Sequence, residues 1–217
     1  MRLICILMLG AALLVACTVN VSPPLGTSLG MRAFESMKVI ERHNISVGLY
    51  IDPKLRSYKV TATIRSGNYE FNLGEALSTK LIKALAYQFN RVKLAGNLAD
   101  AKTEDAIFII SLKDIDVQLK AVSGWAKVEA KSYVRLALRA ELRDTKHNRI
   151  VWVGTTDAKE ELVHEEMGEM KYQEAGRGFA RAIDRAIDHA IGDLLAQMAK
   201  SANFKKYVNQ KGRKQGV

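Results

Sequence analysis

The sequence has little cysteine and little proline. Its two cysteines, Cys5 and Cys17, both lie within the first 17 residues, so no disulfide bond can form within the rest of the chain. Only 3 prolines, together with a hydrophobic content of 48%, exclude a chain that is disordered over most of its length. About 200 residues follow Cys17, which is enough for one domain stabilised by its own hydrophobic core.

The sequence also lacks the motifs of common catalytic sites. It contains no glycine-rich phosphate-binding loop, no serine in a nucleophile-elbow context and no cysteine nucleophile beyond Cys17. Its carboxylates do not have the spacing of a matched general acid and base. We therefore predict that the protein is not an enzyme and holds no cofactor. Residues far apart in the sequence can still meet in space, so a hydrolase stays as the third hypothesis.

The candidate for a metal site is His164, which lies within the acidic segment 160–169. A histidine beside carboxylates can bind a metal ion, but this segment lacks the two-histidine helical spacing of a zinc hydrolase. We therefore predict no metal site. The acidic segment is predicted to be a solvated loop or the first turn of the following helix, where acidic side chains favour the helix dipole. Its glutamates are Glu160, Glu161, Glu165, Glu166 and Glu169.

The one long apolar run stands at the start of the chain. Arg2 is followed by a mainly apolar stretch from Leu3 to Leu14, which is too short to span a bilayer comfortably. Small residues then precede Cys17, as at the cleavage site of a secretory signal peptide. We therefore predict that residues 1–16 are a signal peptide. No other apolar run in the sequence approaches the length of a membrane-spanning helix.

Leu14-Val15-Ala16-Cys17 resembles the lipobox of bacterial lipoproteins. The resemblance implies cleavage before Cys17 and diacylation of its thiol, which makes Cys17 the lipid attachment point. Thr18 follows, and by analogy with lipoprotein sorting the lack of aspartate there favours the outer membrane, with the domain facing the periplasm. An ordinary signal peptide that carries a cysteine near its end is the alternative.

Residues 17–32 are predicted to be the lipidated cysteine and a flexible tether. Pro23-Pro24, Gly26 and Gly30 favour irregular backbone in this segment. A tether of roughly 15 residues, at about 3 Å each, would hold the domain tens of ångströms above the lipid. At the other end of the chain, residues 201–217 are predicted to be a frayed basic tail.

The chain is basic, with a formal net charge of +10. In a cytosolic protein this charge would indicate nucleic acid as a partner, but export largely removes that option, and we predict no nucleic-acid binding. The polyanions of the envelope are lipid head groups, lipopolysaccharide and acidic glycans, which a basic surface can face. A solvated surface that only maintains solubility is the alternative.

Hydrophobic periodicity predicts a single α+β domain over residues 33–200. Alternating apolar residues predict strands, and apolar residues at three- and four-residue spacing predict helices that cover a sheet. Residues 106–110 are apolar on both faces, which predicts a central strand, and a bulge is predicted at Lys113-Asp114. Residues 69–71 are expected to lead directly into the first helix. The strands are predicted at 44–51, 58–64, 91–94, 106–119, 128–143 and 149–154, with an extended arm as the alternative for 58–64, and the helices at 73–89 and 172–200.

Residues 128–143 show the clearest alternation, with apolar side chains at nearly all even positions. The pattern predicts a long antiparallel strand with one buried and one exposed face. The exposed face carries Arg135, Arg139 and Arg143, which form a candidate surface for an anionic ligand or a partner. A mixed-charge solvent face, paired across the neighbouring strand, is the alternative.

The segment from Val134 to Asp144, followed by Arg149-Ile-Val-Trp152, resembles small Gram-negative lipoproteins. These are the transport-associated auxiliary lipoproteins and their relatives in polysaccharide export and lipopolysaccharide assembly. The resemblance implies a fold like the N-terminal domain of the TolB protein, and accessory or assembly roles. With the periodicity it predicts an α+β fold: a mixed, mostly antiparallel sheet of four to five strands with two helices packed on one face.

We therefore predict a lipid-anchored scaffold or adaptor subunit of a cell-envelope transport or assembly system. Its partners would be the membrane, through acyl chains on Cys17, and an envelope protein complex, with self-association into a homo-oligomer as a further hypothesis. The second functional hypothesis is a binder or carrier of an anionic lipid or glycan. An envelope hydrolase is the third.

Overall fold

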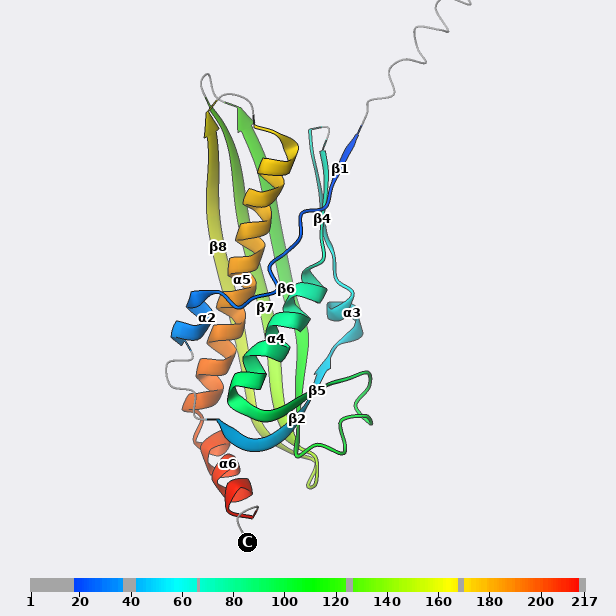
Figure 1. Cartoon of the computed structure of the whole chain (residues 1–217), viewed down its shortest axis with the longest axis vertical. Helices are drawn as coiled ribbons and strands as arrows, with labels where there is room; N and C mark the ends of the chain where they lie inside the picture. The colour runs from blue at the N-terminus through cyan, green and yellow to red at the C-terminus, as the bar shows by residue number, and fades with distance from the viewer. Residues whose placement is uncertain (1–17, 37–41, 66, 124–126, 168–169, 215–217) are drawn as a thin grey trace, which may run out of the picture.

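Two β-sheets and the helices that pack on them form the structure, a computed structural model that describes residues 18–36, 42–65, 67–123, 127–167 and 170–214 (Figure 1). The larger sheet has five strands in the order β5-β2-β6-β7-β8, and the smaller has three in the order β1-β4-β3. The elements are β1 (Val19–Val21), α2 (Met31–Ser36), β2 (His43–Ile51), α3 (Pro53–Arg56), β3 (Val60–Ile64), β4 (Gly67–Phe71), α4 (Leu73–Gln88), β5 (Phe89–Ala95), β6 (Ala106–Ser123), β7 (Lys127–Asp144), β8 (Arg149–Met167), α5 (Tyr172–Lys200) and α6 (Ala202–Lys214).

The five-stranded sheet confirms most of the predicted strands. β2 pairs in parallel with both β5 and β6, while β6, β7 and β8 form an antiparallel meander. β6 is therefore a central strand, as its apolar run predicts. Its pairing with β7 shifts register between Leu112 and Asp114, which confirms the predicted bulge. The fold is α+β, and the sheet is mixed, with two parallel and two antiparallel strand pairs, so the prediction of a mostly antiparallel sheet is only roughly matched.

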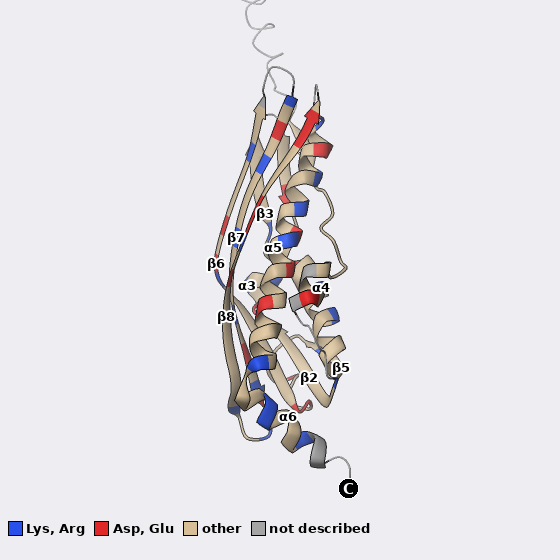
Figure 2. Ribbon diagram, turned by 90° about the vertical axis from the view of Figure 1, so that its left-hand side faces the viewer, with Lys and Arg blue, Asp and Glu red and all other residues tan. Residues whose placement is uncertain are grey.

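Helices α4 and α5 cover one face of this sheet, as the periodicity predicts, so the molecule has two layers (Figure 2). Val134, Leu136 and Leu138 of β7 are fully buried beneath the helices. The apolar stripe of α5 meets them from the other side, and its Ile183 and Ile187 are fully buried too. Alternation in the strand and three- to four-residue spacing in the helix thus bring two apolar faces together.

A second sheet, which the periodicity did not predict, stands beside α5. Residues 69–71 were expected to lead into the first helix, but they belong to β4, which pairs with β3 on one side and β1 on the other. Tyr69 and Phe71 alternate on its buried face and are 3% and 0% exposed. The single predicted sheet is therefore only part of the strand structure.

The acidic segment 160–169 is not a loop or a first helical turn over the residues that the structure describes. β8 continues to Met167, with Glu160 7% exposed and the residues on either side, Lys159 and Glu161, exposed to solvent. The segment is therefore the second half of a long edge strand. The segment alternates with a period of two, and Ala158, Glu160 and Leu162 lie on the face that packs against α5. The many charged residues concealed this alternation in the sequence.

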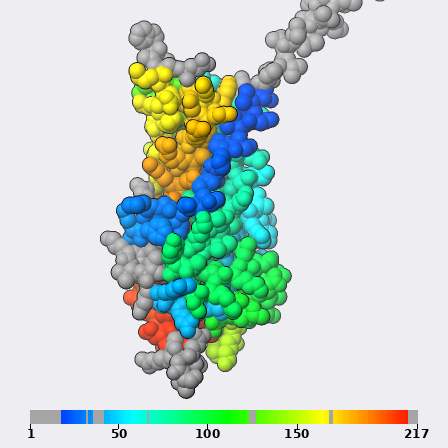
Figure 3. All heavy atoms as spheres, in the orientation of Figure 1, coloured from blue at the N-terminus to red at the C-terminus, as the bar shows by residue number. Residues whose placement is uncertain are grey.

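Both ends of the described chain are packed on the domain, against the prediction of a tether and a frayed tail. Residues 22–30 cross the front of α5 between β1 and α2 (Figure 1), and Figure 3 shows the same segment lying flat on the surface. Leu25 and Leu29 of this segment pack on the core. At the other end, α6 buries Phe204 and Tyr207, which are 2% and 3% exposed.

Within the described residues, no helix has both the length and the apolar character that crossing a membrane requires.

Candidate functional site

The predicted lipid attachment point, Cys17, lies outside the described residues. The structure describes the chain from Thr18 onward, and β1 begins at the next residue. Val19 of β1 is already paired in parallel with Gly67 of β4. One residue therefore separates Cys17 from a hydrogen-bonded strand.

Residues 19–30, here called the N-terminal strap, are held on the domain by hydrogen bonds to their backbone. The amide of Gly26 donates to both carboxylate oxygens of Asp184 on α5, at 2.9 and 2.8 Å. The ammonium of Lys83 on α4 donates to the carbonyl oxygen of Thr27 at 2.6 Å. A Cβ atom on Gly176 would lie 2.7 Å from Pro23, so glycine at that point of α5 permits the close approach.

A buried ion cluster lies under the strap. Lys80 of α4 is 1% exposed, and its ammonium lies 3.1 Å from a carboxylate oxygen of Asp184 and 3.1 Å from one of Asp188. Gly30 of the strap approaches Asp188 so closely that a Cβ atom there would overlap the carboxylate. A single buried cation therefore serves two carboxylates, and both carboxylates also hold the strap.

Burial has the largest effect on the pKa of Asp188. Burial, with the nearby charge of Asp184 added to it, raises the pKa of Asp188 above its ordinary value, although Lys80 and the amide of Gly30 oppose the change. Charged residues in an amphipathic helix usually lie on its solvent-exposed faces. Here the strap covers Lys80 and Asp188, and nothing in the helix pattern predicts it.

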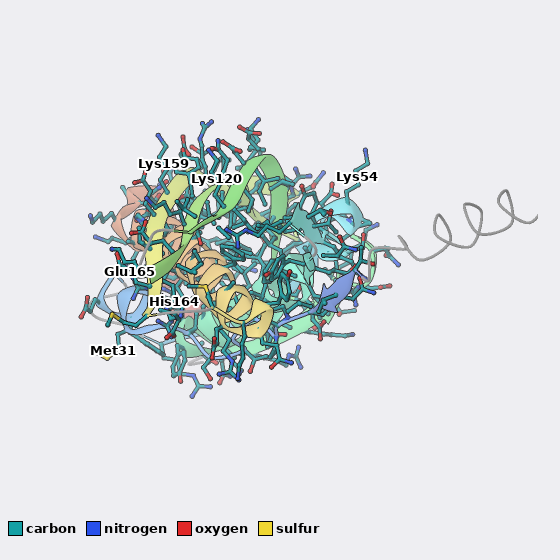
Figure 4. The ribbon with its side chains drawn as sticks, turned by 90° about the horizontal axis from the view of Figure 1, so that it is seen from above. Met31, Lys54, Lys120, Lys159, His164 and Glu165 are labelled. Carbon is teal, nitrogen blue, oxygen red and sulfur yellow. The ribbon has the colours of Figure 1, made fainter. Side chains whose placement is uncertain are left out.

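The end of the large sheet at which β6 and β8 end has exposed aliphatic side chains beside lysines. Val122, Val163 and Met167 are 44%, 54% and 89% exposed on the outer face of β6 and β8. In the pairing register, Lys131 lies opposite Val163 and Lys127 lies opposite Met167. Lys120 on β6 lies opposite Lys131, and Figure 4 shows Lys120 pointing away from α5. These six residues are here called the tip surface.

The lysines of the tip surface are partly balanced by glutamates. Lys127 lies 2.8 Å from Glu129 and 2.9 Å from Glu165, and Lys131 lies 2.8 Å from Glu129. Hydrogen bonds from Lys127 and Lys131 lower the pKa of Glu129 to about 2, so this carboxylate stays ionised. Lys127 and Lys131 are therefore paired with glutamates.

The predicted arginine row lies on the outer face of β7, but its members are paired. Arg135 makes a bidentate pair with Asp157, at 2.8 Å for both contacts, and also contacts Asp114 at 3.2 Å. Glu141 lies between the other two arginines, Arg139 and Arg143, and contacts both. The hydrogen bond from Arg135 lowers the pKa of Asp157, and the positive charge of Arg135 lowers it further. An anionic ligand at this row would have to compete with these carboxylates.

His164 of the acidic segment and His189 of α5 both lie close to carboxylates. His164 lies 3.3 Å from Glu166. His189 of α5 bridges Glu160 of β8 at 3.2 Å and Asp193 at 3.5 Å. Among the described residues, no group of three histidine, cysteine, aspartate or glutamate side chains has the geometry to hold a metal ion. His189 therefore joins α5 to β8.

A cavity of about 460 Å³ opens between α2 and α4. The rings of Phe34 and Tyr87 meet edge to face in it, with their centroids 5.2 Å apart, and are 39% and 51% exposed. The sequence did not predict this cavity, because Phe34 and Tyr87 lie on two helices far apart along the chain.

No family model matches the chain, and no curated protein sequence matches it. Solved structures with a partial likeness include several bacterial lipoproteins. A protein of Xanthomonas campestris matches with a TM-score of 0.48 and 10% identity, over 84% of this chain and 98% of that chain. A neuraminyllactose-binding hemagglutinin homolog of Helicobacter pylori matches with a TM-score of 0.39 and 12% identity, over 79% of this chain and 94% of that chain. A lipoprotein of Caulobacter crescentus matches with a TM-score of 0.33 and 16% identity, over 71% and 92% of the two chains. At these TM-scores the likeness assigns no function to the chain.

Proposed function

We propose that this protein is a lipid-anchored scaffold or adaptor subunit of a cell-envelope transport or assembly system, attached to the outer membrane through acyl chains on Cys17 and facing the periplasm. The observation that carries the proposal is the N-terminal strap. It joins the predicted anchor to the domain without a free tether, because pairing begins at Val19.

A docked strap suits a scaffold better than a carrier. A carrier that moves a lipid or glycan between membranes needs reach, and a free tether of roughly 15 residues would provide tens of ångströms of it. Here Gly26 is hydrogen-bonded to Asp184, and Thr27 is hydrogen-bonded to Lys83. The segment therefore lies along the surface of the domain and gives it no reach. A domain held in this way presents the same surfaces to its neighbours at all times, which favours assembly.

The paired arginine row also supports the scaffold over the anionic carrier. Arg135, Arg139 and Arg143 each lie beside a carboxylate, so the outer face of β7 is a mixed-charge surface. Exposed pairs of this kind contribute little to stability and give no strong site for an anion.

The anchor is tested by metabolic labelling with radioactive palmitate in cells. The wild-type protein should incorporate label, and Cys17→Ser should not, because the acylated thiol is then absent. The matched control is Cys5→Ser, which lies in the predicted leader and should leave labelling unchanged. A wild-type protein without label would overturn the lipid anchor.

The scaffold role is tested by photo-crosslinking in cells. A photoreactive residue is introduced at Thr155 on the outer face of β8, and separately at Tyr87 in the cavity beside α2. At least one position should capture an envelope protein. Charge reversal of all three arginines should not abolish that capture. Recovery of lipid or glycan alone, lost on charge reversal, would replace the scaffold with the carrier.

A further inference from the structure

The start of β1 limits how far the domain can stand from its anchor. Only Thr18 lies between Cys17 and Val19, and two residue steps span at most about 7 Å of extended chain. An acylated Cys17 lies at the lipid interface, because its acyl chains enter the bilayer. The end of the molecule that holds Val19 must then lie within about 1 nm of the head groups.

The tip surface lies at that same end. Val19 pairs with Gly67, and a side chain at Gly67 would contact Tyr172, the first residue of α5. α5 in turn starts five residues after Met167, where β8 ends. Figure 1 shows the same arrangement, with β1 and the ends of β6, β7 and β8 together at the top, and α6 at the bottom.

The chemistry of the tip surface fits a lipid interface. Val122, Val163 and Met167 are exposed aliphatic side chains, which gain by entering the boundary between head groups and acyl chains. Lysines stand beside them in the register, and a lysine can keep its ammonium among anionic head groups while its stem contacts apolar groups. The opposite end of β8 also exposes Val153, at 40%, but has no anchor near it.

We propose that the tip surface rests on the membrane to which Cys17 is anchored, so that the long axis of the domain points away from the bilayer and α6 lies farthest from it. This inference depends on the proposed acylation of Cys17. The surface it names is a lipid-contacting face formed by Val122, Val163 and Met167 with Lys120, Lys127 and Lys131.

The orientation is tested with fluorescent reporters on one strand. The acylated protein has no free thiol once the leader is removed and Cys17 is modified, so single cysteines can be labelled selectively. Val163→Cys and the matched Val153→Cys both lie on the outer face of β8, ten residues apart. Each labelled full-length acylated protein is incorporated into vesicles of phosphatidylethanolamine and phosphatidylglycerol that contain lipids spin-labelled at the head group.

Quenching should be much stronger at residue 163 than at residue 153. The two positions are about 33 Å apart along the strand, so we expect a difference of roughly threefold or more. Val122→Cys lies on β6, at the same end of the sheet and separated from β8 by β7, and it should be quenched like Val163→Cys. Circular dichroism of each labelled variant confirms that the fold is retained.

The outcomes separate this inference from the proposed function. If the protein incorporates palmitate but quenching is equal at the two positions, or stronger at residue 153, the orientation is overturned and the anchor stands. If the protein incorporates no palmitate, the anchor and the orientation both fail.

Discussion

The N-terminal strap and α6 form two ends of one chain that attach to the domain by different means. In the sequence, neither segment has a long apolar stripe, and both were predicted to be loose. The structure packs both on the same α+β domain. The strap docks through its backbone, whereas α6 docks through its side chains.

The contacts of the strap are backbone amides and carbonyls against buried charges. Gly26 is bonded to Asp184, Gly30 approaches Asp188, and Lys80 sits between the two carboxylates. Val21 of the strap is 7% exposed and packs in the core, whereas its two leucines are only partly buried. Docking of the strap therefore combines a buried charge balance with a small apolar contact.

α6 is held mainly by aromatic packing. The ring of Phe204 lies 5.3 Å from His43 and 6.2 Å from Phe89, measured between centroids. The hydroxyl of Tyr207 donates to the carbonyl oxygen of Asp105 at 2.9 Å, and Lys211 lies 3.5 Å from the carboxylates of both Asp105 and Asp144. Burial of apolar side chains is the main contribution to the docking of α6, and the ion pairs of Lys211 add to it.

The largest expected effect is the loss of the cation under the strap. Lys80→Met keeps the side-chain volume but leaves two carboxylates in a buried site without a counter-charge, which should cost about 3 to 5 kcal/mol of unfolding free energy. Urea denaturation measures this loss. Hydrogen exchange should show protection lost at the strap amides and retained in α6. Lys83→Met, an exposed lysine one turn away, should cost less than about 1 kcal/mol, and an equal loss there would contradict the buried cluster.

The next effect is the loss of the aromatic anchor of α6. Phe204→Ala should cost about 3 kcal/mol, at the lower end for a buried phenylalanine, because α6 can leave the core without unfolding the rest. Hydrogen exchange should then accelerate in α6 while the strap amides stay protected, the reverse of Lys80→Met. Phe34→Ala is the matched control, since Phe34 is 39% exposed and its loss should cost clearly less. Equal losses at the two positions would remove the distinction between the two ends.

A smaller effect separates the two ends by the sign of their pH dependence. Burial raises the pKa of Asp105, but hydrogen bonds from Ser46 and the charge of Lys211 outweigh it and hold that pKa below its ordinary value of 3.8. Its stabilising contribution is therefore present above about pH 3.8 and lost as the pH falls through the lowered pKa. The pKa of Asp188 is raised, so its contribution is present below about pH 3.8 and lost as the pH rises through the raised pKa.

Asparagine variants measure these two contributions directly. Between about pH 3 and pH 7, the stability of the wild type relative to Asp105→Asn should grow with rising pH. The stability of the wild type relative to Asp188→Asn should fall over the same range. Urea unfolding at several pH values gives both differences. If the two differences changed in the same direction, the contrast between the N-terminal strap and α6 would be wrong.

The smallest effect is expected on the outer face of β7. Arg135→Gln removes the bidentate partner of Asp157, so the pKa of Asp157 should rise toward its ordinary value of 3.8. The melting temperature should hardly change, because water and salt screen an exposed pair. Carboxyl NMR signals followed through an acid titration measure the pKa. Arg139 pairs with Glu141, so Arg139→Gln should leave the pKa of Asp157 unchanged. An unaltered pKa in Arg135→Gln would contradict the pairing.

Hydrophobic periodicity predicted the elements that have one buried and one solvent-exposed face. β7 alternates because water covers its outer face, and α5 carries a stripe because one side of it meets the sheet. The same signals were present where the prediction failed. Tyr69 and Phe71 alternate in β4, and Phe204, Tyr207 and Val208 follow helical spacing in α6. These segments are short or rich in charge, so their signals were weak beside the polar residues around them.

The sequence alone determined the candidate anchor at Cys17 and the apolar faces of the long strands and helices, because each of these is encoded in neighbouring residues. Only the tertiary structure decided that the predicted tether lies on the domain. The amide of Gly26 meets Asp184, which lies 158 residues away, and such a contact has no period and no local motif. It forms because Lys80, buried by the fold of other elements, holds two carboxylates where the passing backbone can bond to them.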